Sequence, residues 1–578
     1  MRIAGESVQR PAEASVVDLE ILRTTLIATT QEVAAALGNA APTVELSQMR
    51  TFTVAIADAK GSIVAIEDPQ QLGSMAQTVA HAARYFEFDL ADGDVILTND
   101  PYTGGTKVQD LTLLAPLIAD GELLLYVTVR VRVRDMGGQL GGNLYPAATE
   151  LLAEGVPVTP VKIQRLGQPV RDILSMLLLN GRRPAETRRI LDAARAALTL
   201  GRRRLAEIAD SHGVAVTRAS LEYSQTYSER LARQFIGKWQ SGSYEAARLL
   251  ELEPSAGGSV TIRLTANVSE GGLILDFSAS DGQRPVFINS TSGTTASCAI
   301  SALLTILGEG IPANAGLLRA AEIRTRPGTV THASWPAPVG WGDAHCGNEI
   351  TEIVAATLQR AAGVSLPALT VPRPLVLSRK VNDRSDQLDL GRWGIGGASA
   401  LAQIDGWGRP QLSSRAQLPS IEQWETESHY LVESLEFARD GGGAGQWRGS
   451  PGVEASIALR PDQLYTLWTD TSKVAVDGLS GGRAGPAGEV AFHLVEGWQP
   501  GAPRAIEQPI AAARLKLRLA GGGGCGDPRQ RERAAVIDDL ADGLISAAAA
   551  RDVYGLAEQE IATTCRTFGG GIAGDSHD

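Results

Sequence analysis

Two polar, glycine-containing loops, each placed after a strand-like run, constrain the fold of this chain most strongly. The first loop, residues 99–110, follows the apolar run 95–97 and is dense in turn-forming residues. The second, residues 134–138, follows residues 126–133, where apolar and polar side chains alternate as they do in a half-buried strand. Loops of this kind present side chains instead of packing them. If the two strands pair, one pocket collects five charged residues, namely Lys107, Asp110, Arg132, Arg134 and Asp135.

Hydrophobic periodicity along the rest of the chain predicts both helices and strands. The predicted helices cover residues 18–39, 75–86, 172–239 with a break near Gly213, 296–307, 350–362, 533–544 and 547–553. The predicted strands include a hairpin over 53–57 and 62–66, and the runs 260–264, 273–277 and 320–330. This mixture indicates an α+β fold with mixed sheets, helical segments and a β-rich C-terminal half.

The length of 578 residues allows about three or four domains. We expect an N-terminal α+β region with the two loops over residues 1–170, a helical segment over 171–250 and a second α+β region over 251–390. A β-rich, glycine-rich region over 391–530 and C-terminal helices with a tail over 531–578 complete the predicted order.

Charge and hydropathy narrow the classes of function. A formal net charge of -12 argues against nucleic acid as the main partner, because such binding relies on clustered cations. No apolar run approaches the roughly 18 to 20 residues needed to cross a bilayer, and the N-terminus lacks the apolar core of a signal peptide. We therefore expect a cytoplasmic protein without a membrane partner. The four cysteines are scattered without the CxxC spacing of a zinc knuckle.

Both loops and several later segments resemble one family signature. The motifs are Asn99-Asp100-Pro101-Tyr102-x-Gly104-Gly105-Thr106, Asp135-x-Gly137-Gly138, Thr149-Glu150, Ile311-Pro312-x-Asn314-Ala315-Gly316, Gly441-Gly442-Gly443-Ala444-Gly445-x-Trp447-Arg448-Gly449, and Gly521 to Gly524 followed by Gly526-Asp527-Pro528. With them the sequence is similar to the hydantoinase B family, whose members supply one subunit of ATP-dependent hydantoinases, 5-oxoprolinases, lactamases and ketone carboxylases. The resemblance covers almost the whole chain.

The resemblance implies a heteromeric enzyme with divided labour. A separate, actin-like hydantoinase A-type subunit is expected to bind ATP and Mg²⁺ and to phosphorylate an amide or enolate oxygen, and a small third subunit is compatible with the family pattern. This chain itself carries no nucleotide fingerprint, because the glycine run 521–524 is not closed by Gly-Lys-Ser/Thr. No cofactor is therefore expected on the chain itself.

The positions that hold a metal in the family are altered here. The resemblance implies an Asp before Phe52, a His after Gly-Gly-Thr, a His-His pair before the Asp-x-Gly-Gly turn and a His before Leu-Gly-Ser-Met. The residues found there are Thr51, Lys107, Arg132 with Val133, and Gln71, while Asp110 and Asp135 are retained. Protonated Lys and Arg have no lone pair to donate, so we predict that this region holds no metal.

Two interpretations of the altered site stay open. Lys107 and Arg132 suit an anion such as phosphate or bicarbonate, or they neutralise the retained carboxylates of a site that has lost its activity. The first favours a ketone carboxylase resembling acetophenone carboxylase. The alternatives are an ATP-dependent amidohydrolase of hydantoin, lactam or 5-oxoproline, with Asp110, Asp135 or Glu150 as general base, and a structural subunit without catalysis of its own.

The remaining candidate site residues are expected to contact the small-molecule substrate. They are Asn99, Asp100, Tyr102, Gly104, Gly105, Gly137 and Gly138 in the two loops, together with His345 in the later polar loop 342–348. Cys346 follows His345 directly, but adjacent side chains rarely form a nucleophile and base pair, so thiol catalysis is not expected.

Overall fold

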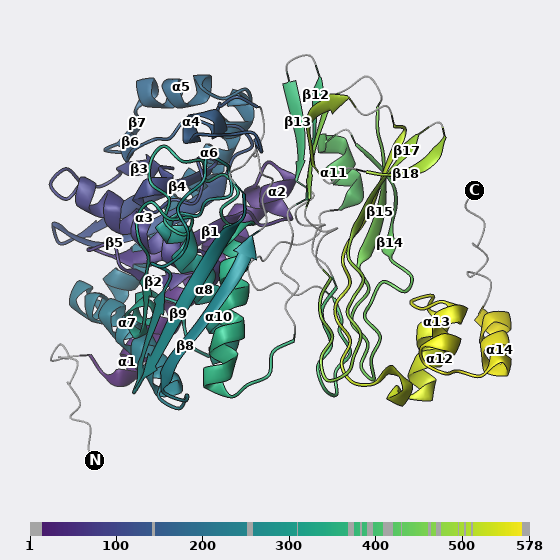
Figure 1. Cartoon of the computed structure of the whole chain (residues 1–578). Helices are drawn as coiled ribbons and strands as arrows, with labels where there is room; N and C mark the ends of the chain where they lie inside the picture. The colour runs from purple at the N-terminus through teal and green to yellow at the C-terminus, as the bar shows by residue number, and fades with distance from the viewer. Residues whose placement is uncertain are drawn as a thin grey trace. The chain divides into compact units, whose positions relative to one another are not determined.

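The structure, a computed structural model, describes residues 14–140, 145–250, 258–308, 310–367, 375–381, 384–389, 397–408, 420–428, 430–460, 464–469, 475–494, 496–501, 504–509 and 512–568. The described residues up to Val364 form one compact unit, and those from Ser365 onward form a second (Figure 1). Helices and several separate sheets occur together, which confirms the predicted multidomain α+β fold. Residues 1–13 and the predicted tail after Phe568 lie outside the described residues.

A seven-stranded antiparallel sheet organises the first unit, with the order β2-β1-β5-β4-β3-β6-β7. Its strands are β1 (Phe52–Asp58), β2 (Ile63–Ile66), β3 (Val95–Thr98), β4 (Asp110–Ala119), β5 (Glu122–Arg132), β6 (Val161–Arg165) and β7 (Gln168–Pro169). The predicted hairpin of β1 and β2 is confirmed. The two strands that precede the polar loops, β3 and β5, do not pair directly, because β4, which was not predicted, lies between them. The apolar run 111–118 forms most of that strand.

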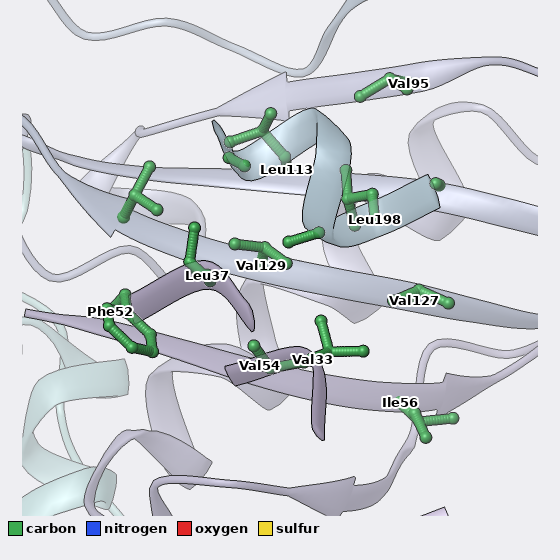
Figure 2. Packing of buried hydrophobic residues seen from close by; sticks show 14 of the residues in the cluster. Val33, Leu37, Phe52, Val54, Ile56, Val95, Leu113, Val127, Val129 and Leu198 are labelled. Atoms are coloured by element: carbon green, nitrogen blue, oxygen red, sulfur yellow. The ribbon is translucent and has the colours of Figure 1, made fainter. Parts of the chain in front are cut away.

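The two faces of the sheet pack against different helices. Successive side chains of β5 point to opposite faces, so this strand contacts both sets of helices. Val127 and Val129 point into an apolar core with residues of α1 (Val16–Ala40) and α6 (Pro184–His212), as Figure 2 shows. Complete burial of one such aliphatic side chain contributes about 1.5 to 3 kcal/mol. Arg130 faces α3 (Leu72–Tyr85) on the opposite side. A strand with both faces covered can therefore carry a buried charge on one face and core packing on the other.

Helices cover the sheet close to the predicted positions. The start of α1 is fixed by a capping box between Ser15 and Asp18, which satisfies backbone donors of the first turn. The predicted break near Gly213 separates α6 from α7 (Val214–Ile236), and a further break precedes α6, after α5 (Arg171–Leu179). The short helices α2 (Val44–Ser47), α4 (Leu151–Glu154) and α9 (Ala315–Ala320) lie in the connections.

A second, four-stranded sheet completes the first unit, in the order β11-β10-β9-β8. It consists of β8 (Gly242–Leu250), β9 (Val260–Ser269), β10 (Gly272–Asp276) and β11 (Ala321–Arg324), of which β8 was not predicted. Two mostly buried helices, α8 (Ser292–Leu307) and α10 (Cys346–Ala362), pack together, and α8 also packs on α3. The loop before α10 contains Asp343 and His345.

The second unit contains two antiparallel sheets followed by helices. One sheet has the order β13-β12-β16-β19 and consists of β12 (Leu375–Val381), β13 (Arg384–Asp389), β16 (Leu464–Thr469) and β19 (Arg504–Pro509). The other has the order β14-β15-β20-β17-β18 and consists of β14 (Leu431–Phe437), β15 (Val453–Ala458), β17 (Glu489–Leu494), β18 (Gly497–Pro500) and β20 (Arg514–Arg518). The helices are α11 (Ile421–Ser428), α12 (Arg533–Ala541), α13 (Ala547–Asp552) and α14 (Glu558–Phe568).

The glycine motifs of the second unit lie where backbones touch. A Cβ atom added to Gly521 would lie 1.7 Å from the Gly441 carbonyl oxygen, and one added to Gly452 would lie 1.9 Å from the Leu519 carbonyl oxygen. No side chain fits at such separations, so these glycines are required by backbone packing. Among the described residues of both units, no helix combines the length and apolar character needed to cross a membrane.

Candidate functional site

Three of the five predicted catalytic residues meet at one end of the main sheet. Asp110 begins β4 and lies directly opposite Arg132, near the end of β5, in the antiparallel register. Lys107 lies three residues earlier in the polar loop, and Asp343 reaches the same place from the loop before α10. We call Lys107, Asp110, Arg130, Arg132 and Asp343 the cation cluster, for the three positive side chains it contains.

Asp110 is held as a carboxylate by its neighbours. It accepts hydrogen bonds from Arg132 Nε at 2.8 Å, from Arg132 Nη2 at 3.2 Å and from Thr106 Oγ1 at 2.5 Å. Burial alone would raise the pKa of Asp110, but the positive charges of Arg132 and Lys107 outweigh burial and hold that pKa well below its usual range. A carboxylate stabilised in this way is a weak base.

Asp343 places a carboxylate between two cations. Lys107 Nζ lies 3.1 Å from Asp343 Oδ1 and 3.0 Å from Oδ2, and Arg132 Nη2 lies 3.9 Å from Oδ2. The Lys107 side chain is only 5% exposed, whereas that of Asp343 is 38% exposed. Lys107 is therefore buried and Arg132 is partly buried, with its side chain 15% exposed, while the Asp343 carboxylate is the most exposed of these groups.

Arg130 is a third cation that was not singled out in the sequence. Its guanidinium is buried and donates to neutral acceptors at 2.7–3.1 Å, namely Thr112 Oγ1, Gln71 Oε1, Ser74 Oγ and Thr78 Oγ1. Burial lowers the pKa of Arg130 to about 10, so it stays protonated at neutral pH. The cluster thus holds three cations and two carboxylates, a net charge of +1. Arg130 lies two residues before Arg132 on the same face of β5, and this spacing in the sequence could have identified it as a member of the cluster.

The residues present at the family's metal positions do not fit a metal ion. Lys107 and Arg132 offer no lone pair, and the side-chain oxygen of Gln71 accepts from Arg130 at 3.1 Å. Thr51 Oγ1 donates to the Glu45 carbonyl oxygen at 2.9 Å. Across the described part of the chain, no group of three or more His, Cys, Asp or Glu side chains is arranged to hold a metal.

Asp135 and its glycines form a turn that binds a different part of the chain. Asp135 Oδ1 accepts from the Gly137 amide at 2.8 Å and from the Arg182 amide at 3.2 Å, and the Arg182 guanidinium donates to the Gly138 carbonyl at 2.8 Å. Gly137 and Gly138 both have φ values in the left-handed region, 83° and 82°. These residues fix the connection that precedes α6, and Arg134 likewise binds Glu45 instead of joining the cluster.

Glu150 is exposed at the start of α4, whereas Glu154, four residues on, is buried. Glu154 accepts from the backbone amides of Val339 at 3.0 Å and Gly340 at 2.8 Å. Burial raises the pKa of Glu154 to about 8, although those two hydrogen bonds favour the charged form. The family motif pointed to Glu150, but the carboxyl group with the shifted pKa is that of Glu154. The motif could not show this, because the hydrogen bonds to Glu154 come from residues 339 and 340, far along the chain.

The remaining residues of the first loop serve mainly its shape. Asn99 is buried and bonds the backbone of Val108, Val156 and Val158, and Asp100 caps the short turn that contains Tyr102. The Tyr102 hydroxyl donates to the Ala337 carbonyl. Gly104 has φ 108°, and a Cβ there would lie 2.4 Å from the Thr78 amide nitrogen, while one at Gly105 would lie 2.6 Å from the Asp100 carbonyl.

His345 and Cys346 lie just beyond Asp343. His345 is buried against the rings of Phe287 and Trp341, with centroid separations of 5.7 and 5.6 Å. Burial raises the pKa of the Cys346 thiol well above its usual range, which disfavours a nucleophilic thiolate. His345 therefore helps to shape the loop that delivers Asp343.

Comparisons with known proteins agree with this geometry. A family model described as Hydantoinase B/oxoprolinase matches residues 15–528. Caprolactamase subunit beta of Pseudomonas jessenii is 28% identical over 512 residues, which cover 84% of this chain and 86% of that protein.

Two solved structures share the fold of the chain. The crystal structure of the ATP-dependent caprolactamase from Pseudomonas jessenii matches with a TM-score of 0.86 and 23% identity, over 96% of this chain and 99% of that one. A nucleotide-free acetone carboxylase matches with a TM-score of 0.85 and 16% identity, over 98% of this chain and 84% of that one. At these identities the two matches establish the fold alone.

Proposed function

The chain belongs to the hydantoinase B/oxoprolinase family, and from that premise we propose that it is the B-type subunit of a heteromeric ATP-dependent enzyme that carboxylates a ketone. An A-type partner would bind ATP with Mg²⁺ and phosphorylate the enolate oxygen or bicarbonate. This chain would then receive the anionic intermediate and complete the reaction away from bulk water. The relative named as caprolactamase subunit beta supports a divided, multi-subunit enzyme.

The cation cluster carries the proposal. Asp343 presents a planar, singly charged carboxylate between Lys107 and Arg132, with Lys107 Nζ 3.0 and 3.1 Å from its two oxygens. Bicarbonate has the same planar oxygen pair and the same charge, so it fits the same donors once Asp343 turns away. The net charge of +1 favours an additional anion, and the buried position of Lys107 strengthens that attraction.

Hydrolysis of a cyclic amide is the second candidate, supported by the caprolactamase relative. It requires a metal or a general base to activate water, and the three carboxylates proposed for that role are poorly suited. Asp110 is a weak base because two cations hold its charge, Asp135 is engaged by Arg182, and Glu150 is exposed outside the cluster. The geometry therefore favours carboxylation. A structural subunit without catalysis is the third candidate.

Co-expression with the ATP-binding partner subunit tests the proposal. ADP release is measured with and without bicarbonate, across ketones and cyclic amides. Bicarbonate-dependent turnover of a ketone is expected, whereas bicarbonate-independent opening of a lactam or hydantoin would establish the second candidate.

Variants of the cluster separate a working site from a structural one. Lys107→Met and Arg132→Ala should each lower kcat/KM for bicarbonate by about 10-fold or more, the loss of one charge-assisted hydrogen bond, while gel filtration shows an intact complex. Arg203→Ala is the matched control, because Arg203 is exposed on α6 and, within the described part of the chain, its ion pair is the long 3.9 Å contact with Glu207. Full activity of both cluster variants would contradict catalysis at the cluster and favour the structural subunit.

A further inference from the structure

A groove with a volume of about 720 Å³ lies on the first unit, outside the cation cluster. It is formed by α3, by the short turn that contains Tyr102 and by α9 with β11. Cavities that bind small molecules typically have volumes of about 300 to 1,000 Å³. None of the cluster residues lines it, although α3 contributes to both places.

One face of α3 supplies most of the chemistry of the groove. Small residues along this face, together with Ala296 and Ala315 from α8 and α9, leave apolar surface without bulky side chains. Beside them Gln77, His81 and Arg84 follow one another at intervals of four and three residues, which places them along one side of the helix. Residues 72–85 contain no Asp or Glu. The face therefore offers hydrogen-bond donors and no carboxylate.

Two of these side chains, Gln77 and Arg84, have donor groups that can bind a ligand in the groove. Gln77 Oε1 accepts from Ser292 Oγ at 2.9 Å, which leaves the Gln77 amide nitrogen as a donor at the groove. Arg84 is exposed and, among the described residues, has no carboxylate within ion-pair distance. Arg319, on the opposite wall, is bound to Gln225 and lies 3.8 Å from Glu229, and Glu322 is paired with Arg324 at 2.7 Å. Among the described residues of the rim, Arg84 is thus a cation without a carboxylate partner.

We propose that this groove binds a small organic anion with a flat apolar body, such as an aromatic carboxylate. The anionic end lies against Arg84 and His81, and Gln77 donates to the same group. The body lies on the alanine and glycine surface, where the absence of side chains lets a flat molecule approach the helix closely. The site is separate from the cation cluster and does not depend on the reaction assigned there.

Benzoate tests the proposal, with benzamide as its uncharged control of nearly the same shape. Calorimetric titration of the full-length chain should show benzoate binding and at least 10-fold weaker binding of benzamide. Arg84→Ala should weaken benzoate by about 10-fold or more, because one charge-assisted hydrogen bond is removed. Ala76→Leu, which fills the floor of the groove, should weaken benzoate and benzamide alike.

Two controls place the binding. Arg203→Ala removes an equal charge from exposed α6 and should leave benzoate affinity unchanged, and Lys107→Met should also leave it unchanged. Circular dichroism of each variant checks that the fold is kept. Wild-type affinity in both Arg84→Ala and Ala76→Leu overturns the proposal, as does loss of benzoate binding in Lys107→Met alone, which would move the site to the cluster.

Discussion

The cation cluster and the groove both involve helix α3, but the cations of the cluster are bonded within the chain, whereas the cation at the groove is exposed to solvent. In the cluster, Arg132 is paired with Asp110, Lys107 with Asp343, and Arg130 is surrounded by hydroxyl and amide oxygens. At the groove, Arg84 is exposed and has no described carboxylate partner. A buried charge must find its partners within the chain, because removal from water is costly, whereas an exposed charge is stabilised by water and remains available to a ligand.

The difference between buried and exposed charges is tested most strongly by removing Asp110, the buried carboxylate that is paired with Arg132. Asp110→Ala leaves the buried Arg130 and the partly buried Arg132 near each other with one carboxylate fewer. Loss of one partner of a buried pair costs about 3 to 5 kcal/mol, and we expect that decrease in the free energy of unfolding from urea denaturation. Asp192→Ala is the control, because the Asp192 side chain is 56% exposed and its ion pair with Arg195 is solvated, so its loss should cost less than about 1 kcal/mol. Equal effects of the two variants would refute the distinction.

The buried carboxyl group of Glu154, which is bonded by backbone amides and not by a cation, should make the stability of the protein depend on pH. The folded-state pKa of Glu154 is raised to about 8, above its ordinary value, because burial disfavours the charge. Between the unfolded pKa and pH 8 the folded chain therefore binds more protons than the unfolded chain, and stability falls as pH rises, by up to about 1.4 kcal/mol per pH unit.

Glu154→Gln removes that proton binding. The difference in unfolding free energy between wild type and variant should change steadily between pH 5 and 8 in favour of the variant, measured by urea titration at each pH. A difference that stays constant over this range would mean that Glu154 is ionised throughout.

The smallest expected effect comes from a variant in which a cation of the cluster, like Arg84 at the groove, lacks a carboxylate partner. Asp343→Asn removes the charge of the most exposed carboxylate of the cluster without changing its size, so Lys107 loses its closest negative charge. Stability should fall by less than in Asp110→Ala, because Asp343 is 38% exposed and the asparagine keeps one oxygen as an acceptor for the buried Lys107. Affinity for inorganic phosphate should rise by about 10-fold in calorimetry, and the increase should disappear when Lys107→Met is added. Unchanged phosphate binding would show that Asp343 does not occupy an anion position.

The sequence predicted three of the charges that meet in the cluster, but it also placed Arg134 and Asp135 there, which bind Glu45 and Arg182 instead. Lys107, Asp110 and Arg132 do converge, although β4, which was not predicted, lies between β3 and β5. Local patterns identify side chains on one strand face, so Arg130 was detectable from its position. Asp343 was not, because it is 236 positions from Lys107 and nothing local encodes that contact.

The family motifs predicted the fold better than the chemistry. Asp135, Gly137 and Gly138 match the signature, and in the structure they hold a turn against Arg182. The Trp447-Arg448-Gly449 motif behaves in the same way, since Arg448 binds Asp539 of α12 at 3.2 Å inside the second unit. A motif residue in this chain is thus often a residue that the backbone needs.

Close backbone contact in the second unit bears on how such chains diverge. At Gly449 an added Cβ would lie 2.0 Å from the Gly522 carbonyl oxygen, so even alanine would force two segments apart. That requirement is the same whether the cation cluster binds bicarbonate, holds a metal or does neither. Substitution within the cation cluster is therefore independent of the packing at these glycines, so residues such as Lys107 and Arg132 can change while the backbone contacts that hold the second unit stay the same.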